Sequence, residues 1–215
     1  TGSTATAQAI NRVMAENLPP QAPLIAETGG LNAMIVDSTA LLEQAVQDVV
    51  DSAFQSAGQR CSALRMLYVQ SDIADAFERM LCGAMQALVV GPPEAANCDV
   101  GPLIDAAAQR RIAAHIARHK ILFQTSAPEK GYFIAPTLLS VSGMSDLHEE
   151  IFGPVLHLAR YDAGDLDRVI DYINASGYGL TFGFHSRIDD RVQKVVSRVN
   201  VGNLYINRNQ IGAVV

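Results

Sequence analysis

The sequence predicts an α/β fold with an open, mostly parallel sheet flanked by helices. Short apolar runs typical of strands alternate with amphipathic helical patterns along the whole chain, and glycine or proline separates many of them. Strands that alternate with helices favour parallel pairing. The chain has 215 residues, of which 49% are hydrophobic, so it can bury a sizeable core.

The first half of the chain follows this alternation. Helices are expected where apolar residues recur at helical spacing, and Pro19 and Pro92 should end two of them because proline cannot continue a helix. Ser38 is expected to cap a helix. The predicted helices cover residues 5–17, 41–54 and 72–88, and the predicted strands cover residues 23–27, 32–37 and 64–69.

The second half repeats the alternation. Asp105 opens a helical pattern, and Gly177, Gly179 and Gly183 punctuate a strand. The predicted helices here cover residues 105–120, 165–175 and 189–199. The predicted strands cover residues 121–124, 133–139, 155–161, 180–185 and 201–206.

Charge and cysteine content narrow the functional class. A net charge of −6 argues against a nucleic-acid surface. Three cysteines without paired spacing argue against a disulfide framework, so a reducing, cytoplasmic location is expected. No apolar run is long enough to span a bilayer. Both ends stop inside recognisable patterns, so the chain is expected to be a piece of a longer protein.

Two residues could carry covalent chemistry. Cys61 lies in a loop of small and polar residues between a helix and a strand, and Glu27 ends a predicted strand at the Gly29-Gly30 turn. A thiolate attacks carbonyl carbon well, and a nearby carboxylate can activate water to hydrolyse the resulting thioester. A buried structural cysteine and a surface carboxylate are the alternatives that these residues leave open when each is taken alone.

Other stretches are informative but ambiguous. Glu150 and Phe152 stand before a Gly-Pro turn, where a carboxylate could accept both hydroxyls of a ribose. Gly2-Ser3-Thr4 precedes a helix and could either bind phosphate or simply cap it. His115 and His119 have metal-clip spacing, but no third ligand is evident and a solvated face is favoured, so no metal site is expected.

Together these stretches resemble the motifs of the aldehyde dehydrogenase superfamily. The matching segments are Glu27-Thr28-Gly29-Gly30, Gly58-Gln59-Arg60-Cys61, Glu150-Ile151-Phe152-Gly153-Pro154 and Thr1-Gly2-Ser3-Thr4. The separation of Glu27 from Cys61, 61 − 27 = 34 residues, is also the spacing usual in the family. The resemblance narrows to the L-glutamate γ-semialdehyde (Δ1-pyrroline-5-carboxylate) dehydrogenases of bifunctional proline utilisation proteins. This narrower resemblance is carried by residues 27–38, 133–138, 179–183 and 205–215.

The resemblance implies a role for each matching residue. Cys61 would be the nucleophile and Glu27 the general base, with NAD as the cofactor. Substrate-binding residues would take the α-carboxylate of the aldehyde. The implied cofactor-binding residues are Gly2, Ser3, Gly29, Glu150 and Phe152, and the implied substrate-binding residues are Ser62, Gly212 and Ala213.

The resemblance also implies a domain division and partners. Residues 1–26 would be the end of an NAD-binding domain, and residues 27–215 a truncated catalytic domain. A proline dehydrogenase module, with its own FAD, would lie elsewhere on the parent chain, and the parent would form a homo-oligomer. The isolated chain is expected to be inactive. A different aldehyde substrate and a non-catalytic folded module remain the alternatives.

Overall fold

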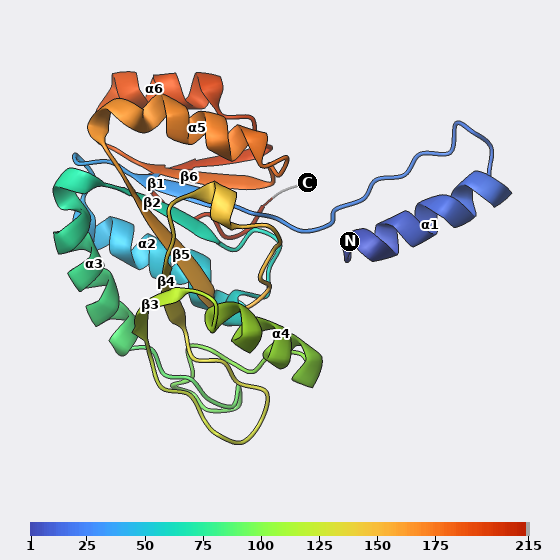
Figure 1. The fold of residues 1–215 in the computed structure, drawn as a ribbon, viewed down its shortest axis with the longest axis horizontal. Helices are drawn as coiled ribbons and strands as arrows, with labels where there is room; N and C mark the ends of the chain where they lie inside the picture. The colour runs from blue at the N-terminus through green and yellow to red at the C-terminus, as the bar shows by residue number, and fades with distance from the viewer. Residues whose placement is uncertain (214–215) are drawn as a thin grey trace.

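A seven-stranded sheet forms the centre of the molecule, with strand order β3-β4-β5-β2-β1-β6-β7 (Figure 1). This computed structural model describes residues 1–213, so Val214 and Val215, the end of the predicted catalytic domain, lie outside the described residues. All neighbouring strands are parallel except β3 and β4. The strands are β1 Ala33–Val36, β2 Met66–Gln70, β3 Lys120–Gln124, β4 Thr137–Ser140, β5 Val155–Tyr161, β6 Thr181–His185 and β7 Asn203–Ile206. The predicted open, mostly parallel sheet is confirmed.

Helices cover both faces of the sheet (Figure 1). The helices α2 and α3 pack on one face, where they share a core with β1, β2, β4 and β5. On the other face, residues of α5 and α6 share a core with β1, β2, β5 and β6. The helices are α1 Thr4–Asn17, α2 Leu42–Phe54, α3 Ser71–Gln86, α4 Ala106–Ile116, α5 Leu166–Ala175 and α6 Asp189–Arg198, with short 3₁₀ turns at η1 Gln55–Gly58, η2 Met144–Asp146 and η3 Ala163–Asp165.

Successive side chains of a strand belong to different hydrophobic cores. Met34 and Val36 of β1 belong to the α2–α3 core, whereas Ala33 and Ile35 belong to the α5–α6 core. Successive side chains of a strand point to opposite faces, so a strand covered on both sides is apolar at every position. This explains the unbroken apolar run in β1.

Some local predictions were wrong, including residues 133–136, which precede β4 and form no strand. Residues 23–27 form no strand, and Ile25 is 82% exposed, because no neighbouring strand pairs with this segment. Ser38 does not cap α2, which begins at Leu42 after a turn. In that turn the Asp37 carboxylate accepts hydrogen bonds from the N–H and hydroxyl of Thr39.

The first helix projects away from the body (Figure 1). No residue of α1 is buried, and the side chains of Ile10 and Val13 are 48% and 59% exposed. Ser3 caps the helix by accepting a hydrogen bond from the Thr6 N–H. The arrangement is compatible with a domain boundary near residue 26, which stays a prediction.

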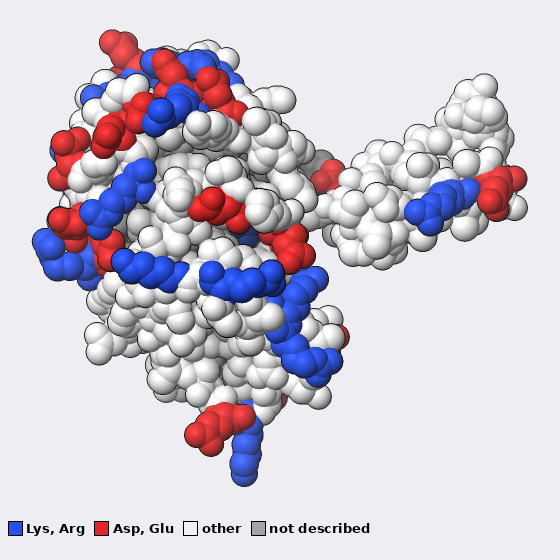
Figure 2. Space-filling model, in the orientation of Figure 1, with Lys and Arg blue, Asp and Glu red and all other residues white. Residues whose placement is uncertain are grey.

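Charges of both signs are interspersed over the α5–α6 layer on the face seen in Figure 2. Here Lys194 pairs with Asp167 at 2.7 Å, and Arg198 pairs with Asp171 at 2.7 Å. Among residues 1–213, no helix is both long and apolar enough to cross a membrane.

The predicted solvated face at His115 and His119 was wrong for His115, which is only 7% exposed. The Nε2 atoms of His115 and His157 lie 2.8 Å apart. His157 donates from Nδ1 to the Arg65 carbonyl at 2.8 Å, so its Nε2 must accept from His115. Burial lowers the pKa of His157 to about 3 and that of His115 to about 4.

These neutral histidines predict acid sensitivity. Above pH 6.5 they are neutral in both the folded and the unfolded chain. As the pH falls from 6.5 towards 4, the unfolded chain binds protons that the folded chain refuses, so the free energy of unfolding should decrease. The variant His157→Gln should reduce this slope by up to about 1.4 kcal/mol per pH unit in urea unfolding measurements. The exposed His148→Gln should leave the slope unchanged, and an equal effect of both variants would contradict the assignment.

Candidate active site

Three of the predicted site residues lie in segments that lead into the amino ends of parallel strands. Glu27 precedes β1, Cys61 precedes β2, and Glu150 precedes β5. Glu27 therefore does not end a strand, as the sequence suggested, but lies in the segment that leads into one. Ligands of open α/β sheets usually bind at the carboxyl ends of the strands. This candidate site occupies the opposite edge.

A strained turn presents Cys61. After α2, Ser56, Ala57 and Gly58 have φ values of 56°, 54° and 65°, in the left-handed region that favours glycine. A Cβ atom on Gly58 would overlap the backbone carbonyl of Gly153. The turn is thus packed against the Gly-Pro segment that follows Phe152, and Cys61 emerges half-buried from it.

The Asn32 side chain holds the loop that follows the turn. Its Nδ2 donates to the carbonyls of Cys61 at 2.6 Å and of Ala63 at 2.9 Å. Its Oδ1 accepts from the N–H of Thr181, the first residue of β6, at 3.1 Å. One amide therefore joins the entrances of three strands and fixes the backbone on both sides of Ser62.

A buried arginine, Arg65, binds the carboxylate of Glu150. Arg65 is 0% exposed and forms an ion pair with Glu150 at 3.1 Å. The same guanidinium donates to the Gly153 carbonyl and lies 5.4 Å from the centre of the Phe152 ring. Burial lowers the pKa of Arg65, whereas the charges of Glu150 and of Cys61 raise it. Arg65 thus stands within electrostatic range of both candidate motifs.

The Gly29-Gly30 turn permits close approach between these parts. Gly29 has φ +92°, and a Cβ there would lie 2.9 Å from the second carboxylate oxygen of Glu150. At Gly30, a Cβ would lie 2.8 Å from the Cys61 carbonyl. The turn therefore brings the segment after Glu27 against both the Cys61 loop and Glu150.

Glu27 opens onto a hollow of about 540 Å³. Thr4, Gly29 and Tyr178 also line it, and the Glu27 carbonyl accepts a hydrogen bond from the Gly2 N–H at 3.2 Å. The start of α1 thus lies beside the predicted base. In this structure the Gly2 N–H is engaged by Glu27 and the Ser3 hydroxyl by the helix cap.

The predicted substrate-binding residues differ in exposure. Ser62 is only 4% exposed, and its carbonyl accepts from the Thr181 hydroxyl at 3.2 Å. Gly212 is exposed with φ +94°, and Ala213 beside it is half-buried. Gly212 and Ala213 belong to the segment after β7, which reaches Ser62 through Gln210.

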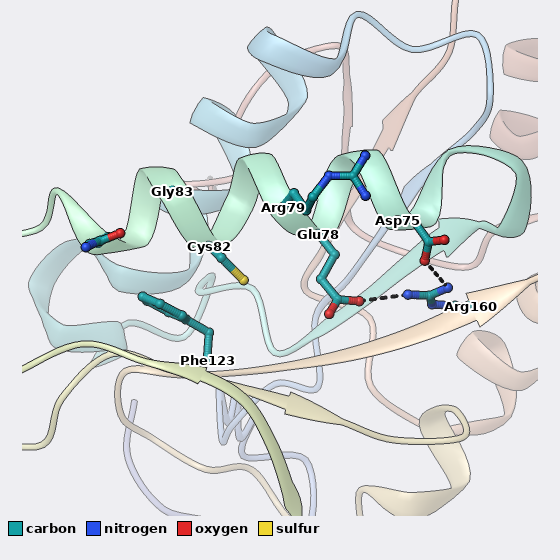
Figure 3. A pocket seen from close by; sticks show the side chains of 8 residues that line it. Asp75, Glu78, Arg79, Cys82, Gly83, Phe123 and Arg160 are labelled. Atoms are coloured by element: carbon teal, nitrogen blue, oxygen red, sulfur yellow. Dashed lines mark hydrogen bonds and ion pairs between the residues drawn. The ribbon is translucent and has the colours of Figure 1, made fainter.

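A second hollow, of about 460 Å³, lies beside α3 (Figure 3). Arg160 within it is already paired with Asp75 at 2.7 Å and Glu78 at 2.9 Å. Cys82 also lines it, and burial followed by the charge of Glu78 raises the pKa of this thiol. A thiol kept protonated is a poor nucleophile, so this hollow does not compete with the site at Cys61.

Sequence reasoning missed Asn32, Arg65, Thr181 and Gln210. Two of them carried a usable signal, because Arg65 is a charge inside an otherwise apolar strand run and Asn32 opens a strand whose next residues are all apolar. The contacts of Thr181 and Gln210 depend on tertiary folding.

The sequence profile of the aldehyde dehydrogenase family matches residues 1–215. The chain belongs to the aldehyde dehydrogenase family. It is 49% identical, over its whole length, to the bifunctional protein PutA of Klebsiella aerogenes, of which it covers 18%. The chain therefore spans about a fifth of the length of this relative.

Solved structures show the same likeness. A crystal structure of bifunctional proline utilization A (PutA) matches with a TM-score of 0.95 and 53% identity, covering 100% of this chain and 22% of that one. A 1-pyrroline-5-carboxylate dehydrogenase from Thermus with bound NAD matches with a TM-score of 0.88 and 32% identity, covering 100% of this chain and 43% of that one. The family resemblance found in the sequence is confirmed, and with it the aldehyde dehydrogenase fold.

The packing of the Cys61 turn predicts a large effect at Gly58. Gly58→Ala combines an unfavourable φ with overlap on Gly153 and should cost more than about 3 kcal/mol. Gly177→Ala is the matched control, because φ is +75° there but nothing lies within 4 Å of the added Cβ. It should cost only about 1 kcal/mol. Urea unfolding of both variants tests this, and equal losses would refute the role of the Gly153 contact.

Proposed function

We propose that the full-length protein oxidises L-glutamate γ-semialdehyde to L-glutamate with NAD as the electron acceptor. The observation that carries the proposal is the joint placement of Cys61, Glu27 and Glu150 around Gly29-Gly30, at one edge of the sheet. Family membership supports the reaction class. The likeness to PutA and to 1-pyrroline-5-carboxylate dehydrogenase supports this particular aldehyde.

In the proposed first step, the Cys61 thiolate attacks the aldehyde carbon and forms a thiohemiacetal. The developing oxyanion can accept a hydrogen bond from the backbone N–H of Cys61. Asn32 restrains the Cys61 carbonyl, so the attacking atom is held on a fixed backbone.

Loss of a hydride from the thiohemiacetal, for which bound NAD would supply the acceptor, leaves a thioester on Cys61. In the second step, Glu27 takes a proton from water, and the hydroxide attacks this thioester. The products are glutamate and the free thiolate. The role of Glu27 needs water access. Its position on the open hollow beside Tyr178 provides it.

The residues present fit an NAD nicotinamide riboside. One oxygen of the Glu150 carboxylate is held by Arg65, whereas the other faces the space left by the missing side chain of Gly29. A carboxylate held in this way can accept ribose hydroxyls. Phe152, half-buried beside it, would contact the nicotinamide, and NAD would supply the hydride acceptor. Gly2 and Ser3 would contact the pyrophosphate.

The length of the relatives supports a further part of the proposal. The PutA relative is described as bifunctional, and this chain covers 18% of it. We propose that a proline dehydrogenase part with FAD lies elsewhere on the full-length protein, and that the full-length protein is a homo-oligomer. The proline dehydrogenase product would then supply the aldehyde substrate.

Replacing the nucleophile should abolish the reaction. In the full-length protein, Cys61→Ala should lower NADH formation by at least about 10³-fold, because the change removes the proposed nucleophile. Cys98→Ala is the control and should retain activity, since that thiol only donates to the Gly91 carbonyl. Near-wild-type turnover by Cys61→Ala would sink the assignment.

Replacing the base should separate the two steps. Glu27→Gln should still allow attack and oxidation but slow hydrolysis by about 10²- to 10⁴-fold. A glutamyl thioester on Cys61 should then accumulate and be visible by intact-protein mass spectrometry. Glu149→Gln, at an exposed neighbour of Glu150, should show no such adduct. If the Glu27→Gln variant turns over slowly but no adduct is detected, the result would count against Glu27 as the base.

A further inference from the structure

Gln210 is a fully buried amide in the segment that joins β7 to Gly212 and Ala213. Its exposure is 0%, and the proposed catalytic steps do not use it. A buried amide loses hydration and is normally compensated by several hydrogen bonds. The hydrogen-bond partners of Gln210 therefore indicate its structural role.

One face of α2 guides this segment from the carboxyl edge of the sheet to the amino edge. Gln44 donates to the Asn207 carbonyl at 2.6 Å, and the Asp48 carboxylate accepts from the Asn209 N–H. Ser52 accepts from the Gln210 N–H at 3.1 Å. Gln44, Asp48 and Ser52 are four residues apart, so they lie in one row along the helix.

The Gln210 side chain connects this segment to the loop that follows Cys61. Its Nε2 lies 3.3 Å from the Thr181 hydroxyl and 3.5 Å from the Ser62 carbonyl. The Thr181 hydroxyl itself donates to the Ser62 carbonyl at 3.2 Å. A carbonyl can only accept, so the amide nitrogen of Gln210 is the atom that must face it.

The same segment also connects to the loop after Cys61 at a second point, Leu64. Ser52, which accepts from Gln210, accepts at its own carbonyl from the Leu64 N–H at 2.9 Å. The backbone of Gln210 is therefore tied to a residue that supports Leu64, and its side chain to Ser62, the residue after Cys61. The segment cannot shift without disturbing one of these bonds.

We propose that Gln210 is a positioning residue that sets the distance between Cys61 and the site for the substrate's α-carboxylate at Gly212 and Ala213. The proposal rests on the proposed function. It adds that selectivity for a carboxylate-bearing aldehyde depends on this amide. Gln210 touches neither substrate nor cofactor and acts through Ser62 and Thr181.

The proposed attack on the aldehyde depends on the distance that Gln210 is proposed to set. An aldehyde held at its carboxylate end reacts well only if its carbonyl carbon then meets the thiolate, and a misplacement of about 1 Å can cost about 10²-fold in rate. A short aldehyde without a carboxylate is not held at that end. Removing the Gln210 hydrogen bonds should therefore lower kcat/KM for the carboxylate-bearing aldehyde more than for the short aldehyde.

The test compares two aldehydes in the full-length protein. Gln210→Met keeps the side-chain volume and removes both the amide donor and the Oε1 atom, which has no hydrogen-bond partner in the described part of the chain, so the variant should fold. The measured quantity is kcat/KM for L-glutamate γ-semialdehyde divided by kcat/KM for butanal. We expect this ratio to fall about three- to tenfold in Gln210→Met, mainly through kcat for the carboxylate substrate.

Matched variants separate positioning from general destabilisation. Gln70 is also a buried glutamine, 3% exposed, but it bonds Ser38 and Asp72 at the carboxyl edge of the sheet. Gln70→Met should lower the stability and leave the selectivity ratio unchanged. Thr181→Val should lower the ratio as Gln210→Met does, whereas Thr181→Ser, which keeps the hydroxyl, should preserve it.

Two outcomes would overturn the proposal, and they differ. If the wild-type protein prefers the carboxylate-bearing aldehyde and Gln210→Met keeps the full preference, the positioning role is wrong and the proposed function stands. If the wild-type protein shows no such preference, the proposed substrate is wrong and the positioning role fails with it.

Discussion

The hydrogen bonds of Asn32 are the interaction on which the amino edge of the sheet depends. Its side chain meets the Cys61 loop and the start of β6, and its backbone carbonyl accepts from Arg65 and Met66. The residue is 3% exposed, so each bond is made in a poorly hydrated environment where a missing partner would be costly. Loop and strands are consequently placed as one unit.

The buried guanidinium of Arg65 adds a second constraint. An arginine in the core is tolerated only with compensating charge and acceptors, which here are Glu150 and the carbonyls of Arg60 and Gly153. Glu150 therefore neutralises a charge carried by the residue before β2. His157 of β5 donates to the Arg65 carbonyl, and His115 of α4 in turn contacts His157.

Predictions from the sequence were strongest where a pattern extends over many residues. The bounds of β5 were predicted exactly as observed, and α2 and α6 differ from their predicted ranges by one residue at one end. Prediction failed where neighbours decide. Residues 23–27 pair with no strand. The Ser38 N–H donates to Gln70, and the buried His115 makes a hydrogen bond to His157.

The sequence by itself determined the family and the alternation of strands and helices, and it singled out Cys61, Glu27 and Glu150 as candidate site residues, because these are local motifs and spacings. Only the tertiary structure decided that they meet at the amino edge of the sheet, and that Asn32, Arg65 and Gln210 support them. Those three residues act through contacts with segments distant in the chain. The order of residues therefore carries no local sign of them beyond a polar side chain beside or within an apolar run.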